Sequence, residues 1–198
     1  MMVKICGITC IEDAQAAVGE GASALGFNFY KPSPRYIAPE AAAGITAALP
    51  KDTLKVGVFV NEFPADVEAI AQAAGLDVAQ LHGKETIDQA PVGYRVWKAF
   101  RVNAEFSLNM LREFPAEAYL LDSPTELYGG SGQIFDWNLA RDLGSRIILA
   151  GGLDASNVRQ AVAAAEPWGV DACSRLESTP GKKDRTKLIA FLRALKNL

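Results

Sequence analysis

The chain has 198 residues, and its 20 Lys and Arg side chains against 23 Asp and Glu give a formal charge of −3. Hydrophobic residues make up 49% and charged residues 22%, which is typical of a globular protein with a sizeable core and excludes a disordered chain. The balanced charge argues against a nucleic-acid-binding face. We expect one domain over residues 1–198.

The nearest approach to a basic cluster lies close to the C-terminus. It consists of Lys182, Lys183, Arg185 and Lys187, and Asp184 interrupts it. A mixed cluster of this kind is typical of the solvated start of a helix, so we expect no polyanion site there.

Cysteine and histidine usage limits the cellular compartment and the metal chemistry. Three cysteines, an odd number in a chain of this size, indicate a reducing compartment rather than a disulfide framework. No apolar stretch is long enough for a signal peptide or a membrane span, so we expect a cytoplasmic protein with no membrane contact. Because His82 is the only histidine and no CxxC pair exists, we expect no metal site.

Short apolar runs rich in β-branched or aromatic residues alternate with longer segments of helical period. The runs predict eight strands, at Val3–Cys6, Ala24–Phe29, Leu54–Val60, Val78–His82, Arg95–Phe100, Tyr119–Asp122, Arg146–Ala150 and Val170–Cys173. The longer segments predict helices at Ile11–Val18, Pro39–Leu49, Pro64–Ala74, Phe106–Phe114, Ser156–Ala165 and Asp184–Leu195. The fourth connection, Glu85–Ala90, has only a weak helical pattern.

Eight strand-and-crossover units average about 25 residues each, which is enough for a repeat of parallel strands joined by helices. An open doubly wound sheet is the competing architecture. Such a sheet carries a GxGxxG turn after its first strand, and the sequence Cys6-Gly7-Ile8-Thr9 does not match that pattern. We therefore predict a closed, parallel (β/α)8 TIM barrel of the α/β class.

The C-terminal ends of the strands, where such a barrel carries its chemistry, are unusually polar. A period of two places Lys4 and Cys6 on the inward face of the first strand and Val3 and Ile5 on the face toward the helices. A buried cysteine is usually a small apolar side chain. However, the Lys4 ammonium, about 7 Å away on the same face, would stabilise a Cys6 thiolate. This favours a chemical role for Cys6.

Two further titratable residues stand at strand ends. Asp122 closes an apolar run, where a carboxylate must be paired, hydrogen-bonded or functional. His82 shares a strand face with Gln80, and its position suits a hydrogen-bonded wall residue as well as a proton carrier.

Four loops suggest ligand contacts. Gly151 and Gly152 follow the seventh strand and Ser174 and Arg175 follow the eighth, and these two loops commonly hold phosphate in such barrels. The alternative is that the two glycines only form a turn. Gly129 and Gly130 belong to a loop that suits a lid next to Asp122. Arg35, in a loop stiffened by proline, suits forked recognition of a carboxylate, unless it is simply solvated.

Several segments together indicate a family. They are Lys4-Ile5-Cys6-Gly7-Ile8-Thr9, Ser33-Pro34-Arg35, Gly57-Val58-Phe59-Val60, Gln80-Leu81-His82-Gly83, Leu121-Asp122, Gly129-Gly130-Ser131-Gly132, Phe135-Asp136-Trp137 and Leu149-Ala150-Gly151-Gly152-Leu153. In these segments, and in their order, the chain resembles the phosphoribosylanthranilate isomerase family of tryptophan biosynthesis over nearly its whole length.

The resemblance implies an Amadori rearrangement of N-(5-phosphoribosyl)anthranilate to 1-(2-carboxyphenylamino)-1-deoxyribulose 5-phosphate, with no cofactor and no metal. It implies that Asp122, kept protonated, is the general acid on the ribose ring oxygen and that the Cys6 thiolate is the general base at C2. Arg35 would bind the anthranilate carboxylate. The residues expected to contact the phosphorylated substrate are Arg35, His82, Gly129, Gly130, Gly151, Gly152, Ser174 and Arg175. The chain would act as a monomer or a homodimer.

One segment departs from the family. After the eighth strand the family usually has serine, then a serine–glycine pair, a hydrophobic residue and glutamate, whereas this chain has Cys173-Ser174-Arg175-Leu176-Glu177. Arg175 in place of glycine must either adopt an uncommon backbone conformation or shift the loop and contribute its side chain to phosphate binding instead.

Two other functions compete with isomerisation. One is a Schiff-base aldolase or lyase that uses Lys98, near the end of the fifth strand, as its nucleophile. The other is a catalytically silent barrel that binds a phosphorylated metabolite or a partner protein. The joint presence of Cys6 and Asp122 argues against the silent barrel, because a binding protein needs neither a thiolate nor a protonated acid.

Overall fold

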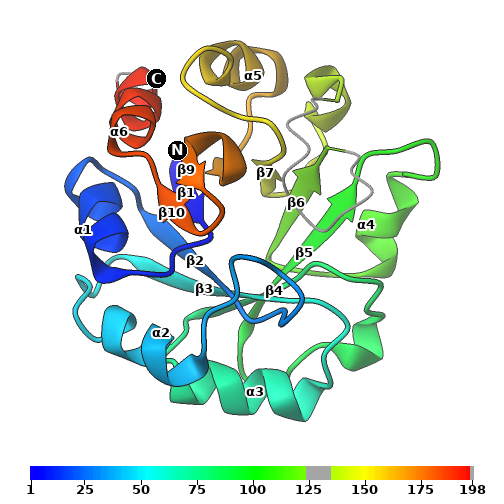
Figure 1. Ribbon diagram of the computed structural model, residues 1–198. Coiled ribbons are helices and arrows are strands. Elements are labelled where there is room, and N and C mark those ends of the chain that lie inside the picture. Colours follow the sequence, from blue (N-terminus) through cyan, green and yellow to red (C-terminus); the bar gives the residue numbers. More distant parts are fainter. Residues whose placement is uncertain (124–134, 197–198) are drawn as a thin grey trace.

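A closed barrel of eight parallel strands forms the centre of the protein (Figure 1). The structure is a computed structural model that describes residues 1–123 and 135–196. The strands are β1 (Met2–Cys6), β2 (Ala24–Asn28), β3 (Leu54–Phe59), β4 (Val78–Leu81), β5 (Arg95–Arg101), β6 (Ala118–Asp122), β7 (Ile147–Leu149) and β8 (Gly169–Ala172). Pairing of β1 with both β2 and β8 closes the ring. The predicted (β/α)8 barrel is thereby confirmed.

Helices surround the strands, and α1 lies beside α6 where the two ends of the chain meet (Figure 1). The α-helices are α1 (Ile11–Gly19), α2 (Pro39–Thr46), α3 (Pro64–Ala73), α4 (Asn109–Glu113), α5 (Val158–Ala165) and α6 (Arg185–Leu195). Short 3₁₀ helices are η1 (Ile87–Gln89), η2 (Trp137–Ala140) and η3 (Ser174–Leu176), and β9 (Glu177–Thr179) and β10 (Lys182–Lys183) form a hairpin. No helix in the described ranges is both long and apolar enough to cross a bilayer.

Three predicted helical segments differ from the structure. The weak fourth connection is only the single turn η1, because Thr86 and Gln89 cap each other around it and the chain then extends toward β5. The fourth α-helix is shorter than expected, since Asn103 and Ser107 form local turns before Asn109. The fifth begins at Val158, because the Asp154 side chain accepts hydrogen bonds from Ser156 and holds that segment in a turn.

Alternation along the strands divides the buried side chains between two cores. Val3 and Ile5 belong to the outer core between strands and helices, whereas Met2 belongs to the core inside the barrel. The predicted inward face of β1 is therefore confirmed. The apolar core inside the barrel also includes Trp97 and Leu120. Buried polar side chains follow at the C-terminal ends of the strands, where they form the candidate site.

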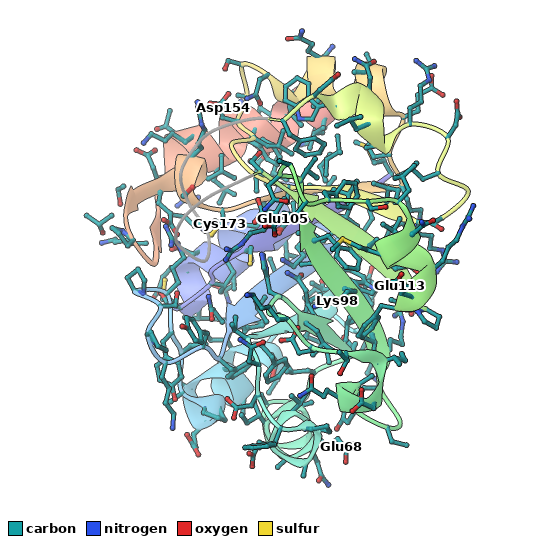
Figure 2. All side chains as sticks on the ribbon, turned by 90° about the vertical axis from the view of Figure 1, so that its right-hand side faces the viewer. Glu68, Lys98, Glu105, Glu113, Asp154 and Cys173 are labelled. Carbon is teal, nitrogen blue, oxygen red and sulfur yellow. The ribbon has the colours of Figure 1, made fainter. Side chains whose placement is uncertain are left out.

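The same alternation places Lys98 of β5 outside the barrel, because its neighbours Trp97 and Ala99 point inward. Its Nζ donates to Glu85 Oε2 at 2.7 Å and lies 5.5 Å from the centre of the Phe114 ring. In Figure 2 Lys98 lies on the side of α4, where Glu113 is also labelled. Burial lowers the pKa of Lys98, and the Glu85 carboxylate partly restores it. Lys98 therefore has a structural partner behind the sheet.

Lys98→Met is expected to lower the free energy of unfolding by about 3 kcal/mol, because it leaves the Glu85 carboxylate buried without its cation. Glu85 also accepts hydrogen bonds from the backbone N–H groups of Asn61 and Gly83, so its carboxylate keeps some stabilisation in the variant. The expected loss of stability therefore lies at the lower end of the range for a broken buried ion pair. Urea titration measures the change. The control is Arg95→Met on the same strand, whose partly exposed pair with Glu117 should contribute no more than about 1 kcal/mol. Equal losses would contradict the buried-pair interpretation.

Candidate active site

A ladder of inward side chains joins β1 to β8, the two strands that close the barrel. The register places Met2 opposite Gly169 and Lys4 opposite Asp171. Lys4 is fully buried, and its Nζ donates to Asp171 Oδ2 at 3.0 Å. Burial alone would lower the pKa of Lys4, but the Asp171 and Cys6 charges raise it above its ordinary value. Lys4 is therefore a permanent cation beneath the site.

Cys6 is the next inward residue of β1 after Lys4, and Cys173, directly after the end of β8, is its partner in ionisation. The Cys173 thiol donates a hydrogen bond that lowers the pKa of Cys6 well below that of an ordinary thiol. Burial opposes this shift, and the positive charge of Lys4 reinforces it. The pKa of Cys173 moves the other way, because its proton is shared with Cys6 and because it is buried. Of the two thiols, Cys6 is therefore the more readily ionised. The sequence predicted a lowered pKa from Lys4, which contributes less than the Cys173 donor, and a chemical role for Cys6 stays a prediction.

Gly26 on β2 provides the space for this arrangement. It lies beside Cys6 in the sheet, and a Cβ atom at Gly26 would meet Cys6 Sγ at 2.8 Å and Lys4 Nζ at 2.9 Å. Both distances are shorter than normal van der Waals contacts, so any side chain here would displace the thiolate or its cation. The glycine is required by close packing inside the barrel.

Asp122 ends β6 inside the barrel, and its Oδ2 lies 3.3 Å from His82 Nε2. On its other side the His82 ring contacts Gln80, with 3.4 Å between Gln80 Nε2 and His82 Nδ1. The predicted shared face of Gln80 and His82 is confirmed. A chain of three polar groups from β4 and β6 therefore ends at the Asp122 carboxyl group.

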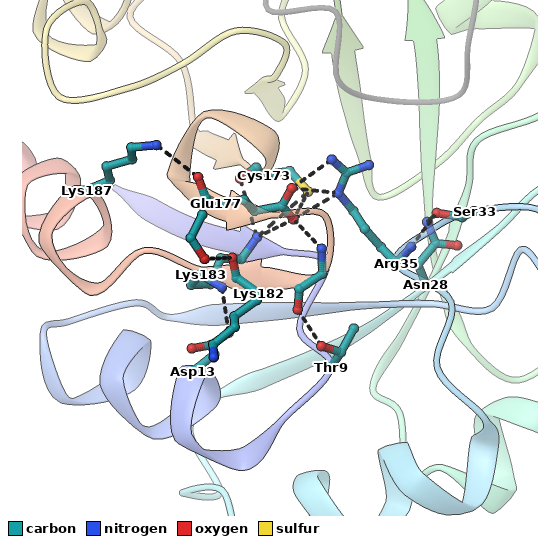
Figure 3. A network of polar contacts seen from close by, with 12 residues as sticks. Thr9, Asp13, Asn28, Ser33, Arg35, Cys173, Glu177, Lys182, Lys183 and Lys187 are labelled. Carbon is teal, nitrogen blue, oxygen red and sulfur yellow. Dashed lines mark hydrogen bonds and ion pairs between the residues drawn. The ribbon is translucent and has the colours of Figure 1, made fainter.

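Arg35 is fixed by a carboxylate that the sequence did not single out. Its Nε donates to Glu177 Oε1 at 2.9 Å and its Nη2 donates to Glu177 Oε2 at 2.7 Å, a forked pair (Figure 3). Burial would raise the pKa of Glu177, but Arg35 and Lys183 hold it below its ordinary value. These contacts set the direction of the guanidinium group, and the Arg35 side chain as a whole is 11% exposed.

Lys183 corrects one prediction from the sequence. Its side chain is fully buried, with Nζ 3.2 Å from Glu177 Oε1 and 3.9 Å from Cys173 Sγ. The expectation of a solvated basic cluster is wrong at this position, because the β9–β10 hairpin folds Lys183 back toward the mouth of the barrel (Figure 3). Asp184 does cap α6, as a helix start requires.

The two predicted phosphate loops lie next to each other. Gly151 and Gly152 have φ values of +81° and +65°, and a Cβ atom on Gly151 would collide with the backbone N of Ser123 at 2.5 Å. Within residues 1–123 and 135–196, no hydrogen bond uses the N–H groups of Gly151, Gly152 or Ser174. Toward the described part of the chain these donors are unused, which agrees with the expectation that they contact an anion without testing it.

Arg175 keeps an ordinary backbone conformation, because it lies in η3 and has no positive φ. Its Nη1 donates to Asp154 Oδ2 at 2.7 Å, so its side chain connects the loop after β8 to the loop after β7. The uncommon backbone conformation raised by the sequence is therefore not adopted by Arg175, and a contribution of its side chain to phosphate binding stays a prediction.

The structure gathers most of the predicted site residues at the C-terminal end of the barrel, on β1, β4, β6 and the loops after β2, β7 and β8. Gly129 and Gly130 lie outside the described residues. Sequence reasoning missed Asp171, Cys173, Glu177 and Lys183. Asp171 points into the barrel from β8, as Lys4 does from β1, and Cys173 comes two residues later. The predicted barrel places these two strands side by side, but the sequence does not show which of their residues lie opposite each other.

Comparison with known proteins gives the family. The family model described as N-(5′-phosphoribosyl)anthranilate (PRA) isomerase matches residues 3–194. N-(5′-phosphoribosyl)anthranilate isomerase from Solibacter usitatus is 58% identical over 99% of this chain and 98% of the relative. The chain belongs to this family.

Solved structures agree with the sequence matches. Phosphoribosyl anthranilate isomerase from Thermus thermophilus has a TM-score of 0.91 and 42% identity, covering 98% of both chains. A second structure, with a TM-score of 0.87 and 40% identity over 100% of both chains, is that of phosphoribosyl anthranilate isomerase in complex with reduced 1-(o-carboxyphenylamino)-1-deoxyribulose 5-phosphate. The Schiff-base alternative finds no support, since Lys98 points away from the barrel interior and pairs with Glu85.

The thiolate assignment predicts the pH dependence of Cys6 alkylation by iodoacetamide. The reactive form is the deprotonated one, so the rate rises with pH through the pKa of Cys6. Because that pKa is lowered, the midpoint should lie well below the value of about 8.5 for a free cysteine. Cys173→Ala removes the hydrogen-bond donor and should move the midpoint to higher pH.

The matched control is Cys173→Ser, which keeps a donor and should shift the midpoint less. Alkylation at Cys6 is followed by peptide mass spectrometry, which separates it from the other thiols. An unchanged midpoint in Cys173→Ala would contradict the shared-proton pair.

Proposed function

We propose that this chain, as a single catalytic domain over residues 1–198, isomerises its substrate with Cys6 as general base and Asp122 as general acid. The chain is an enzyme of tryptophan biosynthesis, and its reaction is the Amadori rearrangement of N-(5′-phosphoribosyl)anthranilate to 1-(2-carboxyphenylamino)-1-deoxyribulose 5-phosphate. The observation that carries the two roles is the placement of a thiolate on β1 and a carboxyl group on β6 inside the same end of the barrel.

The first step opens the sugar ring. A protonated Asp122 donates its proton to the ribose ring oxygen, the C1–O bond breaks, and the anthranilate nitrogen forms a Schiff base with C1. The contact between His82 Nε2 and Asp122 Oδ2 orients the carboxyl group. Apolar neighbours on β6, such as Leu120, limit water around it.

The second step moves a proton on carbon. The Cys6 thiolate removes the proton from C2 of the Schiff base, and the electron pair forms an enolamine. Tautomerisation of the enolamine then gives the ketone. A thiolate held by Lys4 and the Cys173 donor is available at neutral pH, which an ordinary thiol is not.

Two groups of contacts hold the ends of the substrate. We assign the anthranilate carboxylate to Arg35, whose guanidinium Glu177 orients. We assign the phosphate to the N–H groups of Gly151, Gly152 and Ser174 and to the Arg175 side chain, which would exchange Asp154 for the ligand. His82 would contact the sugar beside Asp122.

The proposed cellular setting follows from the same chemistry. A base that works as a thiolate needs a reducing environment, and all three cysteines are free thiols, which supports a cytoplasmic location. The partners we propose are the phosphorylated small molecule and, in a homodimer, a second copy of the chain.

Steady-state turnover of freshly made phosphoribosylanthranilate, followed by loss of its fluorescence, tests the two roles. Cys6→Ser and Asp122→Asn should each lower kcat by at least ~10²-fold, the loss expected when a general acid or base is removed. Circular dichroism checks that both variants fold. A folded wild-type protein that binds phosphate esters without turnover would instead support the silent barrel.

Glu177→Gln tests how Arg35 recognises the carboxylate. The substitution removes the charge and one acceptor from the forked pair, so the guanidinium loses its fixed direction, and KM should rise ~10-fold with a smaller change in kcat.

The matched comparison uses phosphoribosylaniline, which lacks the carboxylate. With that substrate the KM penalty of Glu177→Gln should vanish, because Arg35 has no group to bind. An equal penalty with both substrates would contradict the assignment and indicate a general loss of structure.

A further inference from the structure

Cys6 and Cys173 are direct neighbours across the seam where the barrel closes. The register pairs Ile5, the residue before Cys6, with Ala172, the last residue of β8, and Cys173 follows directly after it, on the inward side already used by Lys4 and Asp171. Neighbouring strands lie about 4.8 Å apart, and a disulfide needs Cα atoms about 4.4–6.8 Å apart. The general spacing between neighbouring strands thus falls inside the range that a disulfide needs.

The two thiol groups also influence each other's ionisation, and both residues are partly exposed. The Cys173 thiol donates to Cys6, and both residues remain partly exposed at the mouth of the barrel. Gly7, with φ +73°, leaves the space for Cys173: a Cβ there would lie 2.9 Å from Cys173 Sγ. A small oxidant that reaches the substrate site therefore reaches this pair.

We propose that Cys6 and Cys173 form a modification site for peroxides, in which oxidation to an intramolecular disulfide removes the catalytic base and reduction restores it. The loss of turnover rests on the role proposed above for Cys6, whereas formation of the bond does not.

Both chemical steps balance. The Cys6 thiolate attacks one peroxide oxygen, the O–O bond breaks, hydroxide leaves, and Cys6 becomes a sulfenic acid. The Cys173 sulfur then attacks the Cys6 sulfur, the S–O bond breaks, and the Cys173 proton leaves with the departing oxygen as water. The peroxide is reduced by two electrons, and the two thiols are oxidised by the same two.

The surroundings favour the second step once the first has occurred. The hydrogen bond to the Cys6 thiolate is the largest cause of the raised pKa of Cys173, ahead of burial and of the Cys6 charge, and a sulfenic acid is no longer a charged acceptor for that bond. Lys183 Nζ, 3.9 Å from Cys173 Sγ, then favours the Cys173 thiolate that must attack. The Glu177 carboxylate, with Oε1 3.8 Å from the same sulfur, opposes this effect but is itself neutralised by Arg35 and Lys183.

Cys10 is an internal control. It lies at the start of α1, and burial together with the nearby Asp13 carboxylate raises the pKa of its thiol. It should therefore be a poor thiolate and a slow target for peroxide.

The experiment treats the full-length reduced protein with hydrogen peroxide and removes the excess with catalase. Peptide mapping under non-reducing conditions should find a Cys6–Cys173 disulfide and a mass lower by two hydrogen atoms. Activity should fall at least ~10²-fold in the fully oxidised protein, because the base is lost. Dithiothreitol should return both mass and activity to their starting values.

Two variants separate the proposed pair from general oxidation. In Cys173→Ser the sulfenic acid has no resolving thiol and passes to the sulfinic acid, so dithiothreitol should restore no activity, relative to that variant's own untreated value. Cys10→Ser should behave as the wild type does. Circular dichroism before treatment confirms that both variants are folded.

The proposal is overturned if mapping of the wild type shows sulfinic acid without a disulfide, a bond that involves Cys10, or bonds between chains. It is also overturned if Cys173→Ser recovers as fully as the wild type. A Cys6–Cys173 disulfide in a protein that still turns over substrate would support the modification site and contradict Cys6 as the base.

Discussion

Charge balance inside the barrel is the constraint on which the candidate site depends. Three cations, Lys4, Arg35 and Lys183, meet at the seam of β1 and β8 with two carboxylates, Asp171 and Glu177. A buried charge is costly unless an opposite charge offsets it, so this set lacks one negative charge. The Cys6 thiolate supplies it. The low pKa of Cys6 is therefore a consequence of how the whole seam is built as well as of the single hydrogen bond from Cys173.

The β9–β10 hairpin has a larger part in the site than its size suggests. It carries Glu177 and Lys183 back across the mouth of the barrel, where Glu177 holds Arg35 from the loop after β2 (Figure 3). Gly181, with φ +84°, permits the turn between the two strands, and its N–H donates to Glu177. One short element thus connects the first two and the last βα units of the ring. Its carboxylate fixes the guanidinium while its ammonium stabilises that carboxylate.

Local patterns in the sequence predicted the barrel and the inward direction of Lys4 and Cys6, because strand alternation and the number of strand–helix units are local properties. The partners of those side chains depend on ring closure. Asp171 lies 167 positions beyond Lys4, and although a closed barrel makes the first and last strands neighbours, no pattern in either segment reveals which residues lie opposite each other. Lys183 shows the same limit: its neighbours Lys182 and Asp184 are charged and at least partly exposed, and only the hairpin buries it. The composition of each strand end could therefore be predicted from the sequence, and the register between the strand ends could not.

The balance at the seam also limits how strong a base Cys6 can be. Each cation or donor that increases the thiolate fraction also lowers the affinity of the sulfur for a proton, and a base is most effective when its pKa lies near the working pH. Asp171 and Glu177 limit this loss of proton affinity, because their negative charges offset part of the effect that Lys4 and Lys183 have on the Cys6 sulfur. Burial raises the pKa of Asp171 to about 7, with the Lys4 charge opposing. Protonation of Asp171 would leave Lys4 to act on Cys6 alone, and the resulting thiolate would be more abundant but weaker as a base.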